Sequence, residues 1–455
     1  MVHTFSCLSK KFALDVESGS CFEIDDLVKE LIDKRNSQQD LGDLLAGKYE
    51  ISEIDDANQE IDILIKRGFL FSKPKLLPQL QITNQVKALC VNISHKCNLS
   101  CAYCFAGGGD YGQTGRVAAS TKNMSLDTAK SCIDFLIQHS GNKRNLEIDF
   151  FGGEPLLNYQ TIKDAISYGR QQEKLHNKLF KFTITTNGLN ITDEMTEYFN
   201  SEVHNVVISI DGRESVHDIM RPDIHGQPSF KRIVKNAVAF NKKRQGSYYI
   251  RGTFTARNLD FSLDVIALAD LGFKQISLEP VVLPDEHPLA LREEHLPILL
   301  KQYELLAKEY LKRKGTDSSF NFFHFNIDLK GGPCLKKRLS GCGVGGEYLC
   351  VSVDGSIYPC HRFDGMEEYK MGSVMCQSPI TLQSPINQKL SYYFQKSNLL
   401  TKPHCNDCFA KYFCSGGCNA NNIEYGGSIN AAHNISCELM RKRVECAIAI
   451  KIQNS

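Results

Sequence analysis

Short apolar runs alternate with amphipathic stretches through the middle of the chain. Most of the runs are continuous rather than strictly alternating, which is typical of parallel strands that helices cover. The predicted strands span residues 89–94, 146–151, 180–185, 205–210, 250–255 and 275–279. Helical periodicity between them predicts helices over residues 125–138, 159–172, 230–243, 260–271 and 294–312.

Six such units predict an incomplete TIM-like barrel, and the pattern differs on either side of it. Before it, short alternating strands, two amphipathic helices and a Pro-containing linker are predicted over residues 11–24, 26–35, 54–68 and 73–78. After about Gly331, short segments separated by Gly and Cys replace the alternation. We therefore expect an α/β fold with three domains. They are an N-terminal winged-helix-like domain (1–78), a partial (β/α)6 barrel (85–325) and a C-terminal cysteine-rich domain (331–455).

Composition narrows the classes of function. The 455 residues include 53 basic and 52 acidic side chains, so a net charge of +1 favours neither nucleic acid nor an anionic membrane as a partner. The N-terminus has no charged segment followed by an apolar one, and no stretch approaches eighteen uninterrupted apolar residues. We expect a cytoplasmic protein.

The 18 cysteines change this picture, because a reducing compartment disfavours disulfides. They cluster: none lies between Cys132 and Cys334, and eleven lie from Cys334 onward. Discrete metal sites are the expected explanation.

The sharpest cysteine motif is a C-x3-C-x2-C loop, formed by Cys97, Cys101 and Cys104 directly after the first predicted barrel strand. Three thiolates can ligate three irons of a cubane cluster and leave the fourth iron open. The carboxyl end of a strand is also where barrel enzymes place their active sites. A zinc site that borrows His95 as its fourth ligand is the alternative.

The next strand end carries a Gly-Gly-Glu-Pro sequence, Gly152 to Pro155, whose paired glycines allow close backbone approach to a ligand. Together with the cysteine loop and Tyr103, this sequence resembles the radical S-adenosylmethionine (SAM) superfamily. That resemblance implies a catalytic role for the loop: the open iron binds SAM, whose reduction gives a 5′-deoxyadenosyl radical. The cofactor-binding residues implied at this strand end are Tyr103, Gly152, Gly153, Glu154 and Pro155, with Glu154 facing the SAM amine.

Two further strand ends match the same family. Thr186 and Asn187 end the third predicted strand, and Ser209 and Asp211 end the fourth; the family uses these positions for ribose and methionine contacts. Each alone is a weak turn signal, whereas together they stand in register at successive strand ends. Arg221 is a candidate for the SAM carboxylate, with a surface salt bridge as its alternative role.

Seven cysteines near the C-terminus resemble the SPASM pattern of radical SAM enzymes that modify peptides and proteins. Four of them form a C-x2-C-x5-C-x3-C run. The resemblance implies that two auxiliary clusters interleave, the first held by Cys342, Cys360 and Cys418 and the second by Cys405, Cys408, Cys414 and Cys437. Two zinc sites would satisfy the same spacing.

The fourth ligand of the first auxiliary cluster is open to several assignments. Some relatives supply an upstream cysteine, here Cys334, and Cys350 is a second candidate. We expect an open or exchangeable position, with Cys334 free or displaceable. The remaining cysteines have no partner spacing and are expected to be ordinary thiols: Cys7, Cys21, Cys90, Cys132, Cys376 and Cys446.

The N-terminal segment resembles the PqqD-like elements that recognise leader segments of ribosomally made peptides. Its hairpin-then-helix layout over residues 12–24 and beyond carries the likeness. In that family an extended leader adds to a sheet edge. A plain packing domain is the alternative.

The whole pattern is most like the thioether-forming maturases of ranthipeptides, including the SCIFF peptide maturases. This resemblance implies three [4Fe-4S] clusters, SAM, a precursor peptide with a leader and a Cys-rich core, and an electron donor such as flavodoxin or ferredoxin. The alternatives are an anaerobic sulfatase maturase, a carbon-carbon cross-linking enzyme and a zinc- or cluster-bearing regulator. Glu279 and Asp211 are expected to face the cavity, and neither is assigned as the catalytic base.

Overall fold

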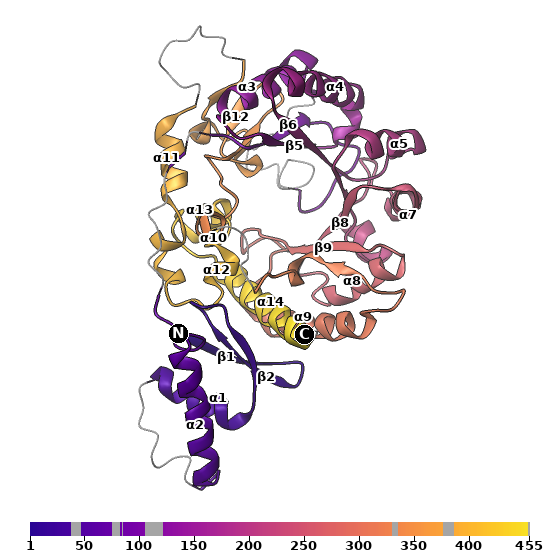
Figure 1. Cartoon of the computed structure of the whole chain (residues 1–455). Coiled ribbons are helices and arrows are strands. Elements are labelled where there is room, and N and C mark those ends of the chain that lie inside the picture. Colours follow the sequence, from indigo (N-terminus) through magenta and orange to yellow (C-terminus); the bar gives the residue numbers. More distant parts are fainter. Residues whose placement is uncertain are drawn as a thin grey trace.

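The structure is a computed structural model that describes residues 1–37, 47–74, 82–83, 85–104, 122–329, 335–375 and 386–453. A partial barrel forms its body, the N-terminal unit projects from one end, and the C-terminal elements line one side (Figure 1). No helix among the described residues has the length and apolar character needed to cross a membrane.

The N-terminal unit is an antiparallel sheet in the order β1-β2-β3, covered by two helices. Leu8 and Ser9 have φ angles of 54° and 64° between β1 and β2, which suits the twist of a tight hairpin. The elements are β1 (Val2–Cys7), β2 (Lys10–Asp15), β3 (Cys21–Ile24), α1 (Asp26–Ser37) and α2 (Ile51–Lys66). Ala13 of the sheet packs with Leu31 and Ile61 of the helices in a small core of its own.

A ten-stranded sheet forms the body, in the order β10-β9-β8-β7-β6-β5-β4-β11-β12-β13. The six predicted strands are β4 to β9, and each pairs in parallel with the next. Their bounds are β4 (Ala88–Ser94), β5 (Asn145–Gly152), β6 (Leu179–Thr186), β7 (Asn205–Ser209), β8 (Ser247–Phe254) and β9 (Gln275–Pro280). This order confirms the predicted α/β partial barrel, since each crossover brings the chain to the neighbouring strand.

Helices connect the barrel strands and cover the sheet. Their apolar faces bury residues such as Ile133 of α3 and Ile233 of α7. The helices are α3 (Leu126–His139), α4 (Tyr159–His176), α5 (Asp193–Glu202), α6 (Glu214–Met220), α7 (Phe230–Lys243), α8 (Phe261–Asp270) and α9 (Leu296–Arg313), with short 3-10 turns η2 (Pro155–Asn158) and η3 (Glu293–His295).

Four further strands extend the sheet, one at one end and three at the other. β10 (Asn321–Phe322) lies beside β9 and is followed by η4 (Phe323–Phe325). At the other end β11 (Tyr348–Val351) pairs in parallel with β4, and β12 (Ser356–Tyr358) and β13 (Gly372–Ser373) follow it in antiparallel order. The C-terminal part is therefore joined to the barrel by main-chain hydrogen bonds.

The C-terminal part consists of short elements and one long helix. They are α10 (Leu335–Ser340), η5 (His361–Phe363), η6 (Glu367–Tyr369), α11 (Gln388–Lys396), η7 (Leu399–Thr401), η8 (Pro403–Cys405), α12 (Lys411–Cys414), α13 (Asn419–Gly426) and α14 (Asn434–Gln453). α14 packs along α9 and also contacts β1 and β3 (Figure 1). It therefore joins the barrel, the cysteine-rich part and the N-terminal unit.

Candidate active site

The cysteine loop after β4 is supported on one side by the Gly-Gly-Glu turn that ends β5. Gly153 N–H donates to Ser94 O at 2.8 Å, and Glu154 N–H donates to Lys96 O at 2.7 Å. Gly152 has a φ of +123°, and a Cβ there would lie 2.2 Å from Ser94 O. The paired glycines therefore let the β5 turn approach the backbone of the cysteine loop closely.

The segment after α6 supports the other side of the loop. Ser100 N–H donates to Pro222 O at 2.8 Å, and Ala102 N–H donates to Met220 O at 2.9 Å. The loop is therefore held between the turn that ends β5 and the C-terminal end of α6, which are far apart in sequence. This bracing fixes the backbone on which Cys97, Cys101 and Cys104 stand.

The three thiols of this loop lie near one another, since the charges of Cys97 and Cys104 both act on Cys101. Burial raises the pKa of Cys97 to about 11 and that of Cys101 to about 12. Leu99 N–H donates to Cys97 Sγ at 3.4 Å, and Asn187 Nδ2 lies 3.9 Å from the same sulfur. Free thiols would therefore be neutral at pH 7, and coordination to iron is what would hold them as thiolates. This donor set fits an iron-sulfur cluster.

His95 does not join these thiols. Its Nε2 lies 3.2 Å from Asp364 Oδ2, and Asn92 Nδ2 donates to the same carboxylate. Within the described part of the chain, no three His, Cys, Asp or Glu side chains are grouped as a site for a single metal ion. The zinc site that borrows His95 is therefore not the arrangement found here.

Glu154 links two of the predicted motifs. Its buried carboxylate accepts hydrogen bonds from Thr186 Oγ1 at 2.7 Å, Asn187 N–H at 2.7 Å and Leu156 N–H at 3.0 Å. Burial raises the pKa of Glu154, and these three donors oppose that rise. Asn187 Nδ2 in turn donates to Asn98 Oδ1 at 2.7 Å inside the cysteine loop. Glu154 thus orients Asn187 toward the loop.

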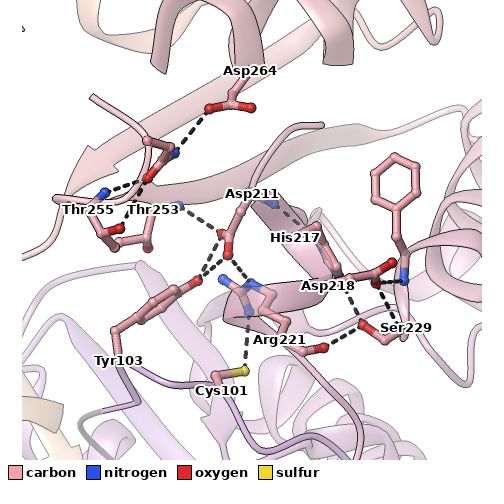
Figure 2. Close-up of polar contacts among 12 residues, drawn as sticks. Cys101, Tyr103, Asp211, His217, Asp218, Arg221, Ser229, Thr253, Thr255 and Asp264 are labelled. Carbon is pink, nitrogen blue, oxygen red and sulfur yellow. Dashed lines mark hydrogen bonds and ion pairs between the residues drawn. The ribbon is translucent and has the colours of Figure 1, made fainter. Parts of the chain in front are cut away.

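Asp211 is the centre of a second buried network (Figure 2). It accepts hydrogen bonds from Tyr103 OH at 2.7 Å and Thr253 N–H at 2.9 Å, and pairs with Arg221 Nε at 3.0 Å. The Arg221 guanidinium lies over the Tyr103 ring and 3.9 Å from Cys101 Sγ. The Arg221 side chain is 11% exposed and that of Asp211 is 0%, so the alternative of a surface salt bridge was wrong.

A neutral histidine closes this network (Figure 2). His217 Nδ1 accepts from Asp211 N–H at 3.3 Å, its Nε2 lies 3.0 Å from Ser229 Oγ, and Ser229 Oγ–H donates to Arg221 O at 2.6 Å. Burial lowers the pKa of His217 to about 4. The neutral ring thereby ties together the two backbone segments whose side chains form the Asp211–Arg221 pair.

The other two predicted site residues occupy neighbouring strand ends. Ser209 is the last residue of β7 and is half-buried, and Pro155 begins η2 and is buried. The ends of β4, β5, β6 and β7 therefore contribute all the predicted residues from the cysteine loop to Asp211, as expected for parallel strands whose carboxyl ends share one edge.

The C-terminal cysteines fall into two sets. The charges of Cys342 and Cys418 act on Cys360, which places these three together as the first cysteine set. The charges of Cys405, Cys408 and Cys414 act on Cys437, and these four form the second cysteine set. Cys342 and Cys418 are exposed, whereas Cys360 is buried.

Other cysteines have partners that the sequence did not reveal. Cys350 stands opposite Cys90 where β11 pairs with β4. Burial raises the pKa of Cys350 well above its usual range, and Cys90, Asp364 and Cys360 of the first cysteine set raise it further. The thiols of Cys7 and Cys446 lie 3.8 Å apart between β1 and α14. The other proposed fourth ligand, Cys334, lies outside the described residues, as does Cys376.

The barrel strands carry charged groups that sequence patterns did not single out. Burial raises the pKa of Asp149 on β5 to about 7, while Thr185 and Arg251 oppose that rise. Glu279, at the end of β9, lies 3.2 Å from His324 Nε2 and 3.6 Å from Arg443 of α14. These neighbours hold the pKa of Glu279 well below its usual range against the effect of burial. Glu279 is therefore an ionised partner of α14.

Comparisons with known proteins cover the part of the chain that carries this site. Residues 91–254 match the family model described as the Radical SAM superfamily. The chain is 26% identical to a cysteine-type anaerobic sulfatase-maturating enzyme of Clostridium novyi, over 77% of this chain and 92% of that protein. It is 22% identical to the radical SAM cyclopropyl synthase TigE of Paramaledivibacter caminithermalis, over 94% of this chain and 89% of that protein.

A third relative and a solved structure complete the comparison. An uncharacterized protein of Methanocaldococcus jannaschii is 30% identical over 62% of this chain and 87% of its own length. The structure of native anSMEcpe with bound AdoMet and the Kp18Cys peptide superposes with a TM-score of 0.62 at 18% identity, covering 80% of this chain and 98% of that one. The chain therefore belongs to the radical SAM superfamily, an enzyme family whose members use a [4Fe-4S] cluster and SAM.

Proposed function

We propose that this enzyme is a peptide maturase that installs thioether cross-links, each joining a cysteine sulfur to a side-chain carbon, in a ribosomally made cysteine-rich peptide. Three [4Fe-4S] clusters would serve the reaction, one on the cysteine loop after β4 and one on each C-terminal cysteine set. The domain boundaries are 1–78 for peptide recognition, 85–325 for the barrel and 331–455 for the auxiliary clusters. A small electron-transfer protein such as flavodoxin or ferredoxin would supply electrons.

The grouping of the C-terminal cysteines carries this proposal. Cys418 lies four residues after Cys414 in the chain, yet its thiol belongs with Cys342 and Cys360. Two separate thiol sets beside a radical SAM barrel suit an oxidative reaction, because one cluster can take up the electron that bond formation leaves over. Forming each thioether removes one hydrogen from carbon and one from the thiol.

The residues at the strand ends have distinct roles in this proposal. When bound, SAM and its cluster supply hydrogen-atom abstraction from the peptide carbon. Arg221 offers a guanidinium for a carboxylate and is itself fixed by Asp211 and Tyr103. Glu154 holds Asn187 in place for contacts to the ligand.

The N-terminal unit supports recognition of a leader segment. β1 and β3 are the two edges of its sheet, and an extended peptide adds to such an edge through main-chain hydrogen bonds. The unit is docked on the segment between Cys408 and Cys414: Glu17 pairs with Lys411 at 2.8 Å and accepts from Tyr412 OH at 2.9 Å. His3 stacks on Phe409 with ring centroids 3.6 Å apart. A bound leader would therefore be anchored close to the auxiliary site.

A second candidate is the maturation of a sulfatase, in which one Cys or Ser becomes formylglycine. The identity to sulfatase-maturating enzymes favours it. The coverage of the two relatives argues for the first candidate over the second. This chain covers 98% of the anSMEcpe structure, yet a fifth of this chain has no counterpart there. The match to the cyclopropyl synthase, in contrast, includes 94% of this chain. That relative also makes carbon-carbon bond formation on a peptide a relevant outcome of the test.

Intact mass of a cysteine-rich peptide encoded beside the gene tests the proposal. After anaerobic incubation with the reconstituted enzyme, SAM and reductant, we expect a loss of two hydrogens per modified cysteine, with those thiols no longer alkylatable. The same loss with all thiols alkylatable would indicate carbon-carbon coupling instead. Formylglycine in a sulfatase peptide, with the cysteine-rich peptide unchanged while SAM is cleaved, would favour the second candidate.

A further inference from the structure

A buried lysine lies between the two C-terminal cysteine sets. Lys402 immediately precedes η8 and is 2% exposed. Its side chain passes Gly416, where an added Cβ would lie 2.9 Å from Lys402 Cδ and where φ is +84°. Its ammonium donates to Gly416 O at 2.8 Å and to Asn419 Oδ1 at 2.7 Å. The glycine turn between Cys414 and Cys418 is thus shaped around this side chain.

The two hydrogen-bond acceptors of the ammonium are neutral. Across the described residues, no Asp or Glu oxygen lies within 4.0 Å of Lys402 Nζ. The neighbours that would act on it as negative groups once they ligate a cluster are Cys405 and Cys414 of the second cysteine set, and Cys418 and Cys342 of the first. Lys402 therefore faces both sets at once.

A buried cation without an anion is costly, so its position calls for negative charge nearby. Burial lowers the pKa of Lys402, and the four cysteines oppose this when they carry negative charge as cluster ligands. An iron-sulfur cluster with thiolate ligands carries net negative charge and would supply the missing counter-ion on each side. The sequence offers a comparison in Lys396, six residues upstream, which is exposed and lies 5.7 Å from the Tyr392 ring.

We propose that Lys402 is a positioning residue that raises the reduction potentials of both auxiliary clusters through its shared positive charge. Reduction adds an electron to an anionic cluster, so a fixed cation nearby stabilises the reduced form. Because one ammonium serves both sets, a single substitution shifts both potentials in the same direction. The inference rests on the proposed function in one respect, that both cysteine sets hold clusters.

A purely structural role for Lys402 predicts something different. If the side chain only braces the turn at Gly416 through its hydrogen bonds, removal would lower stability or iron content and leave the potentials of the loaded clusters unchanged. Lys402→Met keeps most of the aliphatic stem and removes the charge. Lys402→Arg keeps the charge, and Lys396→Met removes an equal charge from the surface of the same part of the chain.

The experiment is a redox titration of the reconstituted full-length protein, followed by electron paramagnetic resonance, with iron and sulfide content measured for each variant. We expect more negative potentials for both auxiliary clusters in Lys402→Met, near wild-type potentials in Lys402→Arg and Lys396→Met, and an unchanged SAM-binding cluster in all three. Unchanged auxiliary potentials in iron-replete Lys402→Met would overturn the inference. If that variant fails to load iron, Lys402→Gln takes its place, and unchanged potentials there have the same meaning.

Cluster content separates this inference from the function on which it rests. If the Cys342→Ala and Cys437→Ala variants contain as much iron as the wild-type protein, these cysteine sets hold no cluster. The proposed function then fails together with the inference. Wild-type protein with three clusters and potentials that do not respond to Lys402 leaves the proposed function standing and removes the inference alone.

Discussion

Replacing Arg221 by Met tests whether the Asp211 network depends on its cation. Asp211 is fully buried and has Arg221 as its ion-pair partner, with hydrogen bonds from Tyr103 and Thr253. The Met side chain fills a similar volume and leaves the carboxylate without a positive charge. We expect a large loss of stability, because ionised Asp211 would then be held by two neutral donors.

The magnitude follows from the distance and the burial. Unit charges about 3 Å apart attract by about 5 kcal/mol at an effective dielectric constant of about 20. Breaking a buried pair by removing one partner costs about 3–5 kcal/mol, and the remaining donors place Asp211 near the lower end of that range. The expected decrease in the free energy of unfolding for Arg221→Met is therefore about 3 kcal/mol.

Denaturant unfolding of the cluster-free protein measures this decrease. The chain has no Trp, so circular dichroism is the natural signal. Arg232→Met is a matched control, because Arg232 pairs with Asp223 at 2.7 Å but is 51% exposed, and we expect it to cost less than about 1 kcal/mol.

A double variant isolates the ion pair. Adding Asp211→Asn to Arg221→Met removes the unpaired charge, and we expect it to recover more than about 1 kcal/mol. If Arg221→Met is no more destabilising than Arg232→Met, or if the double variant recovers nothing, the buried pair does not hold this network together.

Two other predictions concern the same region. Gly152→Ala should prevent iron loading of the cysteine loop, because the added Cβ would lie 2.2 Å from Ser94 O. The control Gly226→Ala, where the added Cβ meets open space, should load iron normally. Equal iron content in the two variants would contradict the bracing role of Gly152. His217 should lower the free energy of unfolding by a total of about 3 kcal/mol as the pH falls from 6.5 to 4. In that pH range His217 binds a proton in the unfolded chain but not in the folded one. His217→Gln should flatten the measured pH dependence of unfolding, and an unchanged slope would assign it to other groups.

The barrel could be predicted because its strands and helices are marked by composition alone. Parallel strands buried on both faces are continuous apolar runs, and the observed bounds of β4 to β9 differ from the predicted ones by a few residues. α14 was not recognised as a helix. It is buried on several sides at once, with Leu439, Arg443 and Ile448 all inside, so it has no single apolar stripe for a pattern to reveal.

The site was predictable in its residue types and less so in what each residue does. Cysteine spacing and strand-end position anticipated that Cys97, Cys101 and Cys104 lie together after β4, because that spacing is local. The role of Arg221 was not local, since its burial depends on α6, a helix of seven residues whose mixed sequence gave no clear period.

The same distinction explains the paired glycines and Lys402. The sequence predicts that Gly152 and Gly153 allow close approach to a ligand; it does not reveal that backbone oxygens at the start of the cysteine loop, more than fifty residues earlier, also exclude a side chain there. Lys402 is one of 53 basic residues, and nothing near it in sequence marks it, because its environment is made by a glycine turn and by thiols from two separate sets. In both cases the function of a residue is set by which distant backbone or charge the fold brings against it, and a pattern along the chain carries no information about that contact.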